Sequence, residues 1–85
     1  MSNIIVNTQL EKVENIESVL QEEYLKVKDL QQKGVLKSLY IKEGNAGAVL
    51  IFESLSLKEV KATIRSLPLY PYFNKIEYSV VEQSF

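Results

Sequence analysis

The chain has 85 residues, of which 46% are hydrophobic and 25% are charged, proportions typical of one small folded domain rather than a disordered segment. Ten basic and eleven acidic side chains give a formal net charge of −1. This balance argues against a nucleic-acid-binding surface, because such surfaces carry surplus positive charge. The lack of cysteine and histidine excludes disulfides, thiol nucleophiles, zinc-finger sites and histidine general bases.

No stretch of the sequence approaches the ~20 apolar residues that span a membrane. Residues 1–6 lack the cationic region and the long apolar core of a signal peptide. Metal ligation would have to use carboxylates alone, and no glycine-rich phosphate loop leads into a helix. We therefore expect a cytoplasmic protein that uses no cofactor and no metal and that binds neither membranes nor nucleic acid.

The first half of the chain predicts a strand followed by a long helix. Residues 4–10 are rich in β-branched side chains and alternate in a way that is typical of a strand. Residues 15–33 contain no glycine or proline, and their apolar positions follow a helical spacing. Acidic residues come first in this segment and basic residues later, which suits the helix dipole. Gly34 is expected to end the helix.

The second half predicts a hairpin, a second helix and a last strand. Residues 35–42 and 48–53 are expected to pair as antiparallel strands around a turn at 43–47, where Gly44 or Asn45 can adopt a positive φ. Ser56 and Glu59 have the spacing of a capping box, and Pro68 helps to end the helix that follows. A bridge at 69–73 then leads into a strand at 75–82.

The resulting βαββαβ order predicts one α+β domain over residues 1–85, with a ferredoxin-like, four-stranded antiparallel sheet and both helices on one face. The strand at 48–53 has apolar side chains on both of its faces. Two helices can cover only one face of a sheet, so the other face needs a different cover. The expected partner is a second copy of the chain, in a homodimer or a larger homo-oligomer.

Four segments of the chain together resemble the sequence of a known protein family. They are Gly34-Val35 through Leu39-Tyr40, Gly47 to Glu53, Leu67-Pro68-Leu69-Tyr70-Pro71-Tyr72, and the final strand through Ile76-Glu77-Tyr78-Ser79-Val80. With these segments the chain resembles the muconolactone isomerase-like group of the dimeric α+β barrel superfamily. The resemblance implies ferredoxin-like protomers that pair sheet to sheet. It also implies a relation to an isomerase that moves a double bond in a lactone without a metal or an organic cofactor.

Glu23 is a charged residue at a position where the helical pattern predicts an apolar one. At 100° per residue it falls inside the apolar stripe of the first helix, between Ile16 and Leu30. A carboxylate that points to the core is costly unless it is paired, hydrogen-bonded or next to a wet cavity. One hypothesis makes Glu23 a base with a raised pKa that shuttles a proton. The alternative makes it a structural partner of a tyrosine, a lysine or the backbone, or lets it bend out to solvent.

Five tyrosines are candidates for ligand binding, namely Tyr24, Tyr40, Tyr70, Tyr72 and Tyr78. Tyr40 and Tyr78 can donate hydrogen bonds to a ligand carbonyl or pack in the core, and those of the bridge can line a pocket mouth or an oligomer contact. Two functions of different classes remain open. The protein is either a cofactor-free isomerase or ligand-binding protein for a small carbonyl-bearing or aromatic molecule, or a non-catalytic structural oligomer. A cavity near Glu23 would favour the first.

Overall fold

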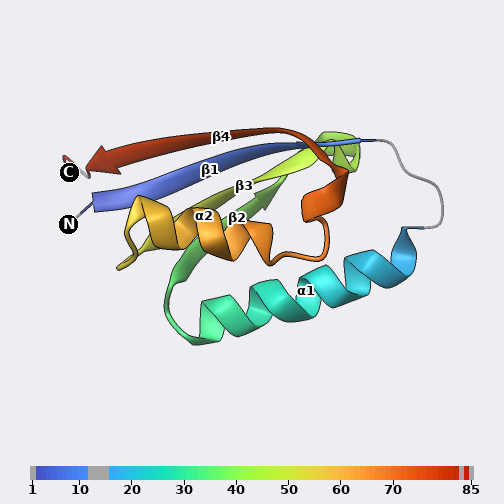
Figure 1. Ribbon diagram of the computed structural model, residues 1–85, viewed down its shortest axis with the longest axis horizontal. Coiled ribbons are helices and arrows are strands. Elements are labelled where there is room, and N and C mark those ends of the chain that lie inside the picture. The colour runs from blue at the N-terminus through green and yellow to red at the C-terminus, as the bar shows by residue number, and fades with distance from the viewer. Residues whose placement is uncertain (1, 12–15, 83, 85) are drawn as a thin grey trace.

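The computed structural model describes residues 2–11, 16–82 and 84 (Figure 1). In this part of the chain the elements are, in order, β1 (Ser2–Leu10), α1 (Glu17–Gln32), β2 (Leu36–Ile41), η1 (Glu43–Asn45), β3 (Gly47–Glu53), α2 (Leu57–Arg65), η2 (Tyr70–Tyr72) and β4 (Phe73–Glu82), where η marks a short 3-10 helix. The predicted βαββαβ order is confirmed. None of the described helices is long and apolar enough to cross a membrane.

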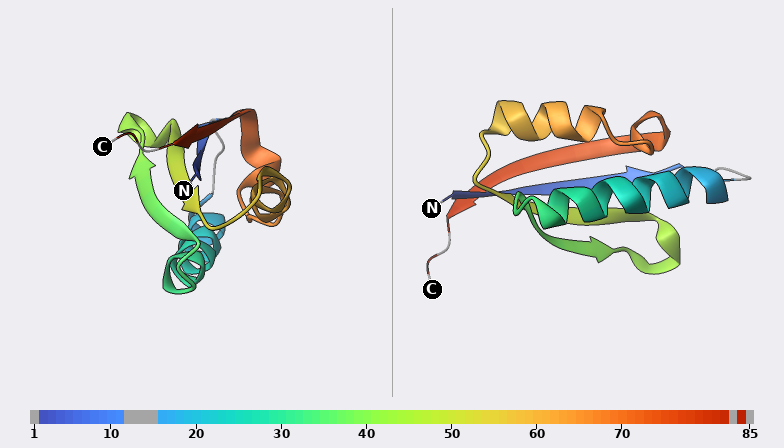
Figure 2. Two further views of the ribbon diagram at one scale, coloured as in Figure 1. Left: turned by 90° about the vertical axis from the view of Figure 1, so that its left-hand side faces the viewer. Right: turned by 90° about the horizontal axis from the view of Figure 1, so that it is seen from below.

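The four strands form one antiparallel sheet in the order β2-β3-β1-β4. The end-on view in Figure 2 shows the sheet curling around α1 and α2, which lie on the same side of it. This arrangement is the predicted ferredoxin-like fold. Figure 2 shows α1 on the β2–β3 side of the sheet and α2 next to β4.

Local signals in the sequence set the ends of both helices. Gly34 has a φ of +78°, and its N–H donates to the carbonyl of Gln31 at 3.0 Å, which ends α1. At the start of α2, the Ser56 hydroxyl accepts from the N–H of Glu59, and the Glu59 carboxylate accepts from the N–H of Ser56, both at 3.2 Å. The predicted capping box is therefore confirmed. The predicted start of α1 at Asn15 lies outside the described residues.

The connection between β2 and β3 is more structured than the predicted turn. Residues 43–45 form the short helix η1, with Gly44 at a φ of +70°. Gly47 then begins β3 one residue earlier than expected, at a φ of +154°. A Cβ at this position would collide with the carbonyl oxygen of Thr8 on β1, so only glycine fits here. The last strand also begins earlier than expected, because Phe73 pairs with Leu10.

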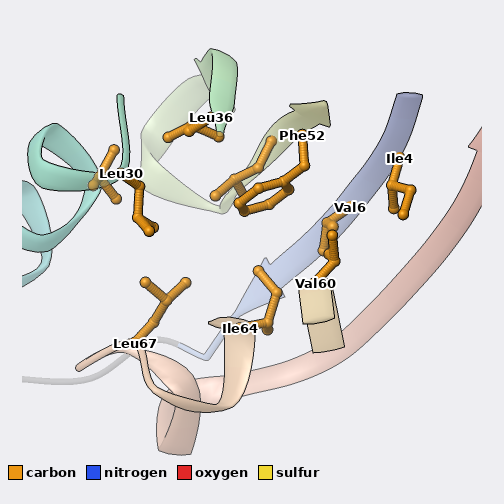
Figure 3. Packing of buried hydrophobic residues seen from close by; sticks show 10 residues of the cluster. Ile4, Val6, Leu30, Leu36, Phe52, Val60, Ile64 and Leu67 are labelled. Atoms are coloured by element: carbon orange, nitrogen blue, oxygen red, sulfur yellow. The ribbon is translucent and has the colours of Figure 1, made fainter. Parts of the chain in front are cut away.

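The core lies between the two helices and the sheet face that they cover. Figure 3 shows Ile64 and Leu67 pointing into the same space as Leu30 and Phe52. The buried cluster comprises Ile4, Val6, Val27, Leu30, Leu36, Leu50, Phe52, Val60, Ile64 and Leu67. Thr8 is also fully buried, and its hydroxyl both accepts from the N–H of Ala48 at 3.1 Å and donates to its carbonyl at 3.0 Å.

The opposite face of the sheet carries apolar side chains that neither α1 nor α2 covers. Ile5 of β1 pairs with Ile51 of β3, and the neighbouring position of β3 is Val49. These three side chains are only partly buried. The face is therefore apolar at its centre, as the strand pattern predicted.

Candidate functional site

Helix α1 turns Glu23 towards the sheet. Leu20 and Val27 lie one turn before and after Glu23, on the same side of the helix. The carboxylate is half-buried, and its Oε1 atom accepts a hydrogen bond of 3.0 Å from the backbone N–H of Leu69, in the bridge that leads to β4. The structural hypothesis is thus correct in one respect, since Glu23 has a backbone partner.

The same carboxylate also lines a cavity of about 200 Å³ between α1, the β2–β3 half of the sheet and the bridge. The lining residues are Leu20, Glu23, Tyr24, Val27, Leu39, Ile41, Ala48, Leu50, Leu69 and Phe73. Glu23 is the one acidic side chain among them, and eight of the other nine residues are apolar. Leu39 and Ile41 are exposed, so the cavity reaches the surface at β2. The site therefore combines a single carboxylate with apolar walls.

This environment changes the acidity of the carboxylate. Burial raises the pKa of Glu23 above its ordinary value of 4.5, and the hydrogen bond from the Leu69 N–H offsets part of that rise. The charged form loses water on burial, and one backbone donor does not replace it fully. A carboxylate with a raised pKa is better matched to proton transfer near neutral pH than an ordinary one.

Chemically, a single carboxylate in an apolar cavity can remove a proton from a carbon next to a carbonyl group and return it to another carbon. Within the described residues no group of three or more acidic side chains lies close enough to hold a metal ion.

The structure brings only one of the candidate tyrosines to this cavity. Tyr24 follows Glu23 on α1 and lines the cavity with it. Tyr40 pairs with Val49 across β2 and β3 on the uncovered face of the sheet, and 61% of it is exposed. Core packing, the alternative role for Tyr40, is therefore wrong, because the helices lie on the other side of the sheet.

The remaining three tyrosines are not among the residues that line the Glu23 cavity. Tyr70 and Tyr72 form the short helix η2, and neither lines the Glu23 cavity. Tyr78 lies on β4, where the Nζ atom of Lys61 is 5.4 Å from its ring centre. Burial raises the pKa of Tyr78, the nearby Tyr70 raises it further, and Arg65 lowers it. None of these three tyrosines therefore lines the cavity with Glu23, although Tyr70 directly follows Leu69, whose N–H binds Glu23.

Sequence patterns alone did not reveal the backbone of Leu69 as a partner of Glu23. A backbone N–H leaves no trace in side-chain periodicity. The available signal was the bridge sequence Leu67-Pro68-Leu69-Tyr70-Pro71-Tyr72, in which two prolines restrict the backbone.

Comparison with known proteins gives a family and several similar structures. The family profile described as muconolactone delta-isomerase matches residues 4–81. The fold is similar to a crystal structure of muconolactone isomerase, with a TM-score of 0.81 and 20% identity over 95% of this chain and 88% of that chain. No curated protein matches the sequence.

Two further solved structures share the fold at lower identity. A 5-chloro-2-hydroxyhydroquinone dehydrochlorinase from Burkholderia phenoliruptrix AC1100, in complex with 2,5-dihydroxybenzoquinone, has a TM-score of 0.69 and 14% identity over 99% of this chain and 96% of that chain. An antibiotic biosynthesis monooxygenase has a TM-score of 0.66 and 14% identity over 98% of each chain. These likenesses establish the fold, and the family profile spans most of the chain. The protein belongs to the muconolactone delta-isomerase family.

Proposed function

We propose that this protein is a cofactor-independent isomerase that moves a double bond next to a carbonyl group in a small ligand, with Glu23 as the base. The observation that carries this proposal is the position of the Glu23 carboxylate. It lines an apolar cavity, and burial raises its pKa. A similar structure that holds 2,5-dihydroxybenzoquinone supports a small oxygenated cyclic ligand.

The proposed reaction begins when the Glu23 carboxylate removes a proton from the carbon between the carbonyl group and the double bond. The electron pair of the broken C–H bond enters conjugation, and negative charge develops on the carbonyl oxygen. The protonated Glu23 then returns the proton to the far carbon of the former double bond, which leaves the double bond conjugated with the carbonyl group. Tyr24, which lines the same cavity, is the candidate donor to that oxygen.

A panel of β,γ-unsaturated lactones in D₂O tests this proposal, with ¹H NMR following double-bond migration and deuterium uptake. Glu23→Gln should lower the rate by about 10²–10⁴-fold, the usual contribution of a general base. Glu22→Gln is the matched control, because Glu22 is the adjacent residue of α1 and is exposed. A wild-type rate no higher than the buffer background, or an undiminished rate in Glu23→Gln, would overturn the proposal.

We further propose that the protein self-associates through the uncovered sheet face, as a homodimer or a larger homo-oligomer. The paired Ile5 and Ile51, with Val49 beside them, form an apolar centre that a second sheet would remove from water. In sedimentation experiments, wild-type protein should be at least a dimer, and Ile51→Lys should be a monomer. Leu25→Lys, on the exposed side of α1, should leave the dimer intact. A wild-type monomer at micromolar concentration would contradict this proposal.

A further inference from the structure

Backbone hydrogen bonds fix the bridge on both sides of Leu69. The N–H of Leu67 donates at 3.1 Å to a carbonyl in the last turn of α2, and the N–H of Tyr70 donates across Leu69 to the carbonyl of Leu67 at 2.9 Å. The N–H of Tyr72 donates at 2.9 Å to the carbonyl of Leu69. The carbonyl of Tyr72 in turn accepts at 2.9 Å from the N–H of Glu11, the residue after β1. The N–H of Leu69 is therefore held in a fixed place between α2 and the end of β1.

This N–H binds only one of the two oxygens of the Glu23 carboxylate. Oε1 accepts the hydrogen bond at 3.0 Å, and within the described residues no other hydrogen bond reaches this carboxylate. In the same part of the chain, no buried side-chain oxygen lacks a hydrogen-bond partner. Oε2, which has no partner, is therefore accessible, and it belongs to a side chain that lines the cavity.

The hydrogen bond makes the two oxygens of Glu23 chemically unequal. An N–H that donates to Oε1 stabilises negative charge there, so Oε1 is the weaker base and Oε2 the stronger. When Oε2 takes up a proton, Oε1 becomes the carbonyl oxygen of a carboxylic acid, which still accepts a hydrogen bond. The bond to Leu69 can therefore persist while Oε2 gains and loses a proton, and the side chain need not rotate between the two steps.

We propose that Leu69 is a positioning residue, whose backbone N–H anchors Oε1 of Glu23 so that Oε2 removes and returns the proton. This inference rests on the proposed function. In the first step a C–H bond of the ligand breaks, its electron pair enters conjugation, and an O–H bond forms at Oε2. In the second step that O–H bond breaks, and the conjugated electrons form a new C–H bond at the other carbon. The Leu69 side chain lines the same cavity, so one residue places both the base and part of the wall against which the ligand lies.

Replacing the Leu69 N–H with an ester oxygen tests this inference, because the change removes the donor and keeps the side chain. A chain of 85 residues is short enough for chemical synthesis with such an ester. The kcat for double-bond migration should fall by about 10- to 100-fold with little change in KM, because a small misplacement of a base is costly. The Leu69 N–H lowers the pKa of Glu23, so the acid limb of the pH–rate profile should move to higher pH in the ester.

An ester at Ser66 is the matched control. It removes a backbone N–H that donates at 3.0 Å to the carbonyl of Thr63, at the exposed end of α2. This control should leave kcat and the acid limb unchanged. An equal loss in both esters would show that weakening the backbone, rather than releasing Glu23, lowers the rate, and would overturn the inference.

A second measurement uses the unaltered backbone and decides the matter even if the Leu69 ester fails to fold. The ¹H–¹⁵N signal of the Leu69 amide should titrate with the same midpoint as the acid limb of the wild-type profile. Among the described residues that line the cavity, Tyr24 is the one other titratable group, so loss of this titration in Glu23→Gln would assign it to Glu23. A Leu69 amide that does not follow Glu23 would overturn the inference.

Failure of this inference and failure of the isomerase proposal give different results. Turnover by the wild type that the Leu69 ester leaves unchanged would overturn the positioning role alone. Absence of turnover in the wild type would overturn both.

Discussion

The Oε1 atom of Glu23 accepts a hydrogen bond from the backbone N–H of Leu69, 46 residues further along the chain, at 3.0 Å. This bond joins the first helix to the bridge that precedes the last strand. Leu69 is only 7% exposed, so water does not readily replace Glu23 as the partner of its N–H. The candidate base is therefore also a structural link, and substitutions at this position separate the two roles.

Replacing Glu23 with alanine removes the acceptor, whereas glutamine keeps a side-chain oxygen in its place. Glu23→Ala should lower the free energy of unfolding by about 1–3 kcal/mol, because a buried N–H loses its partner. Glu23→Gln should be at least as stable as wild type at neutral pH, because it also removes a poorly hydrated charge. Urea denaturation of the three proteins measures both effects. Equal losses in the two variants would show that the charge, rather than the hydrogen bond, stabilises the fold.

The stability of the protein should depend on pH through Glu23. Burial raises the pKa of Glu23 above 4.5, so the folded state holds this proton more tightly than the unfolded state does. The resulting stabilisation is complete below pH 4.5 and is lost as the pH rises through the raised pKa. The difference in Tm between Glu23→Gln and wild type should therefore grow from about pH 4 to about pH 7. A difference that is constant over this range would argue against a raised pKa.

Gly47 should tolerate no side chain. Its φ is +154°, and a Cβ would overlap the carbonyl oxygen of Thr8 on the neighbouring strand. Gly47→Ala should lower the free energy of unfolding by about 2 kcal/mol or more, because the backbone of β1 or β3 must shift. Gly44→Ala is the control, because its φ of +70° is also positive but open space surrounds it. Gly44→Ala should lower the free energy of unfolding by only about 1 kcal/mol. Similar losses in the two variants would contradict the predicted overlap between a Cβ at position 47 and the Thr8 carbonyl oxygen.

The hydroxyl of Thr8 should contribute to stability despite its small size. It is fully buried and bonds to both the N–H and the carbonyl of Ala48. Thr8→Val keeps the shape and removes the hydroxyl, so it should lower the free energy of unfolding by about 1–2 kcal/mol. Thr63→Val also removes a hydroxyl, one that bonds to the Glu59 carbonyl at an exposed helix position. Thr63→Val should change the free energy of unfolding by less than about 0.5 kcal/mol. Thermal melts of the two variants and the wild type measure both changes.

Local signals made most of the fold predictable. Gly34 ends α1, and Ser56 and Glu59 cap α2, because these contacts join residues within a few positions of one another. The helical stripe likewise predicted the side of α1 on which Glu23 lies. These features depend on contacts between residues that are close in the sequence, so residue type and spacing are enough to predict them.

Contacts between distant segments were not predictable in the same way. Periodicity shows where the Glu23 side chain points, but not which backbone group meets it from the bridge. Strict alternation over residues 35–42 places Leu36 and Leu39 on opposite faces. In the structure Leu36 pairs with Phe52 and Ser38 pairs with Ile51, so Lys37 is an extra residue in β2, and no sequence signal marks this bulge. The exposed position of Tyr40 is a consequence of strand register, which depends on the pairing of β2 with β3.

The bulge at Lys37 also affects how molecules meet at the margin of the sheet. In the described part of the chain, β2 is an outermost strand with a partner on one side only. A regular outermost strand offers its free N–H and carbonyl groups to strands of other molecules, which leads to aggregation. A bulge interrupts that row of groups, and an exposed lysine adds charge repulsion between like copies. Protection of the sheet margin therefore favours both the bulge and the lysine at this position.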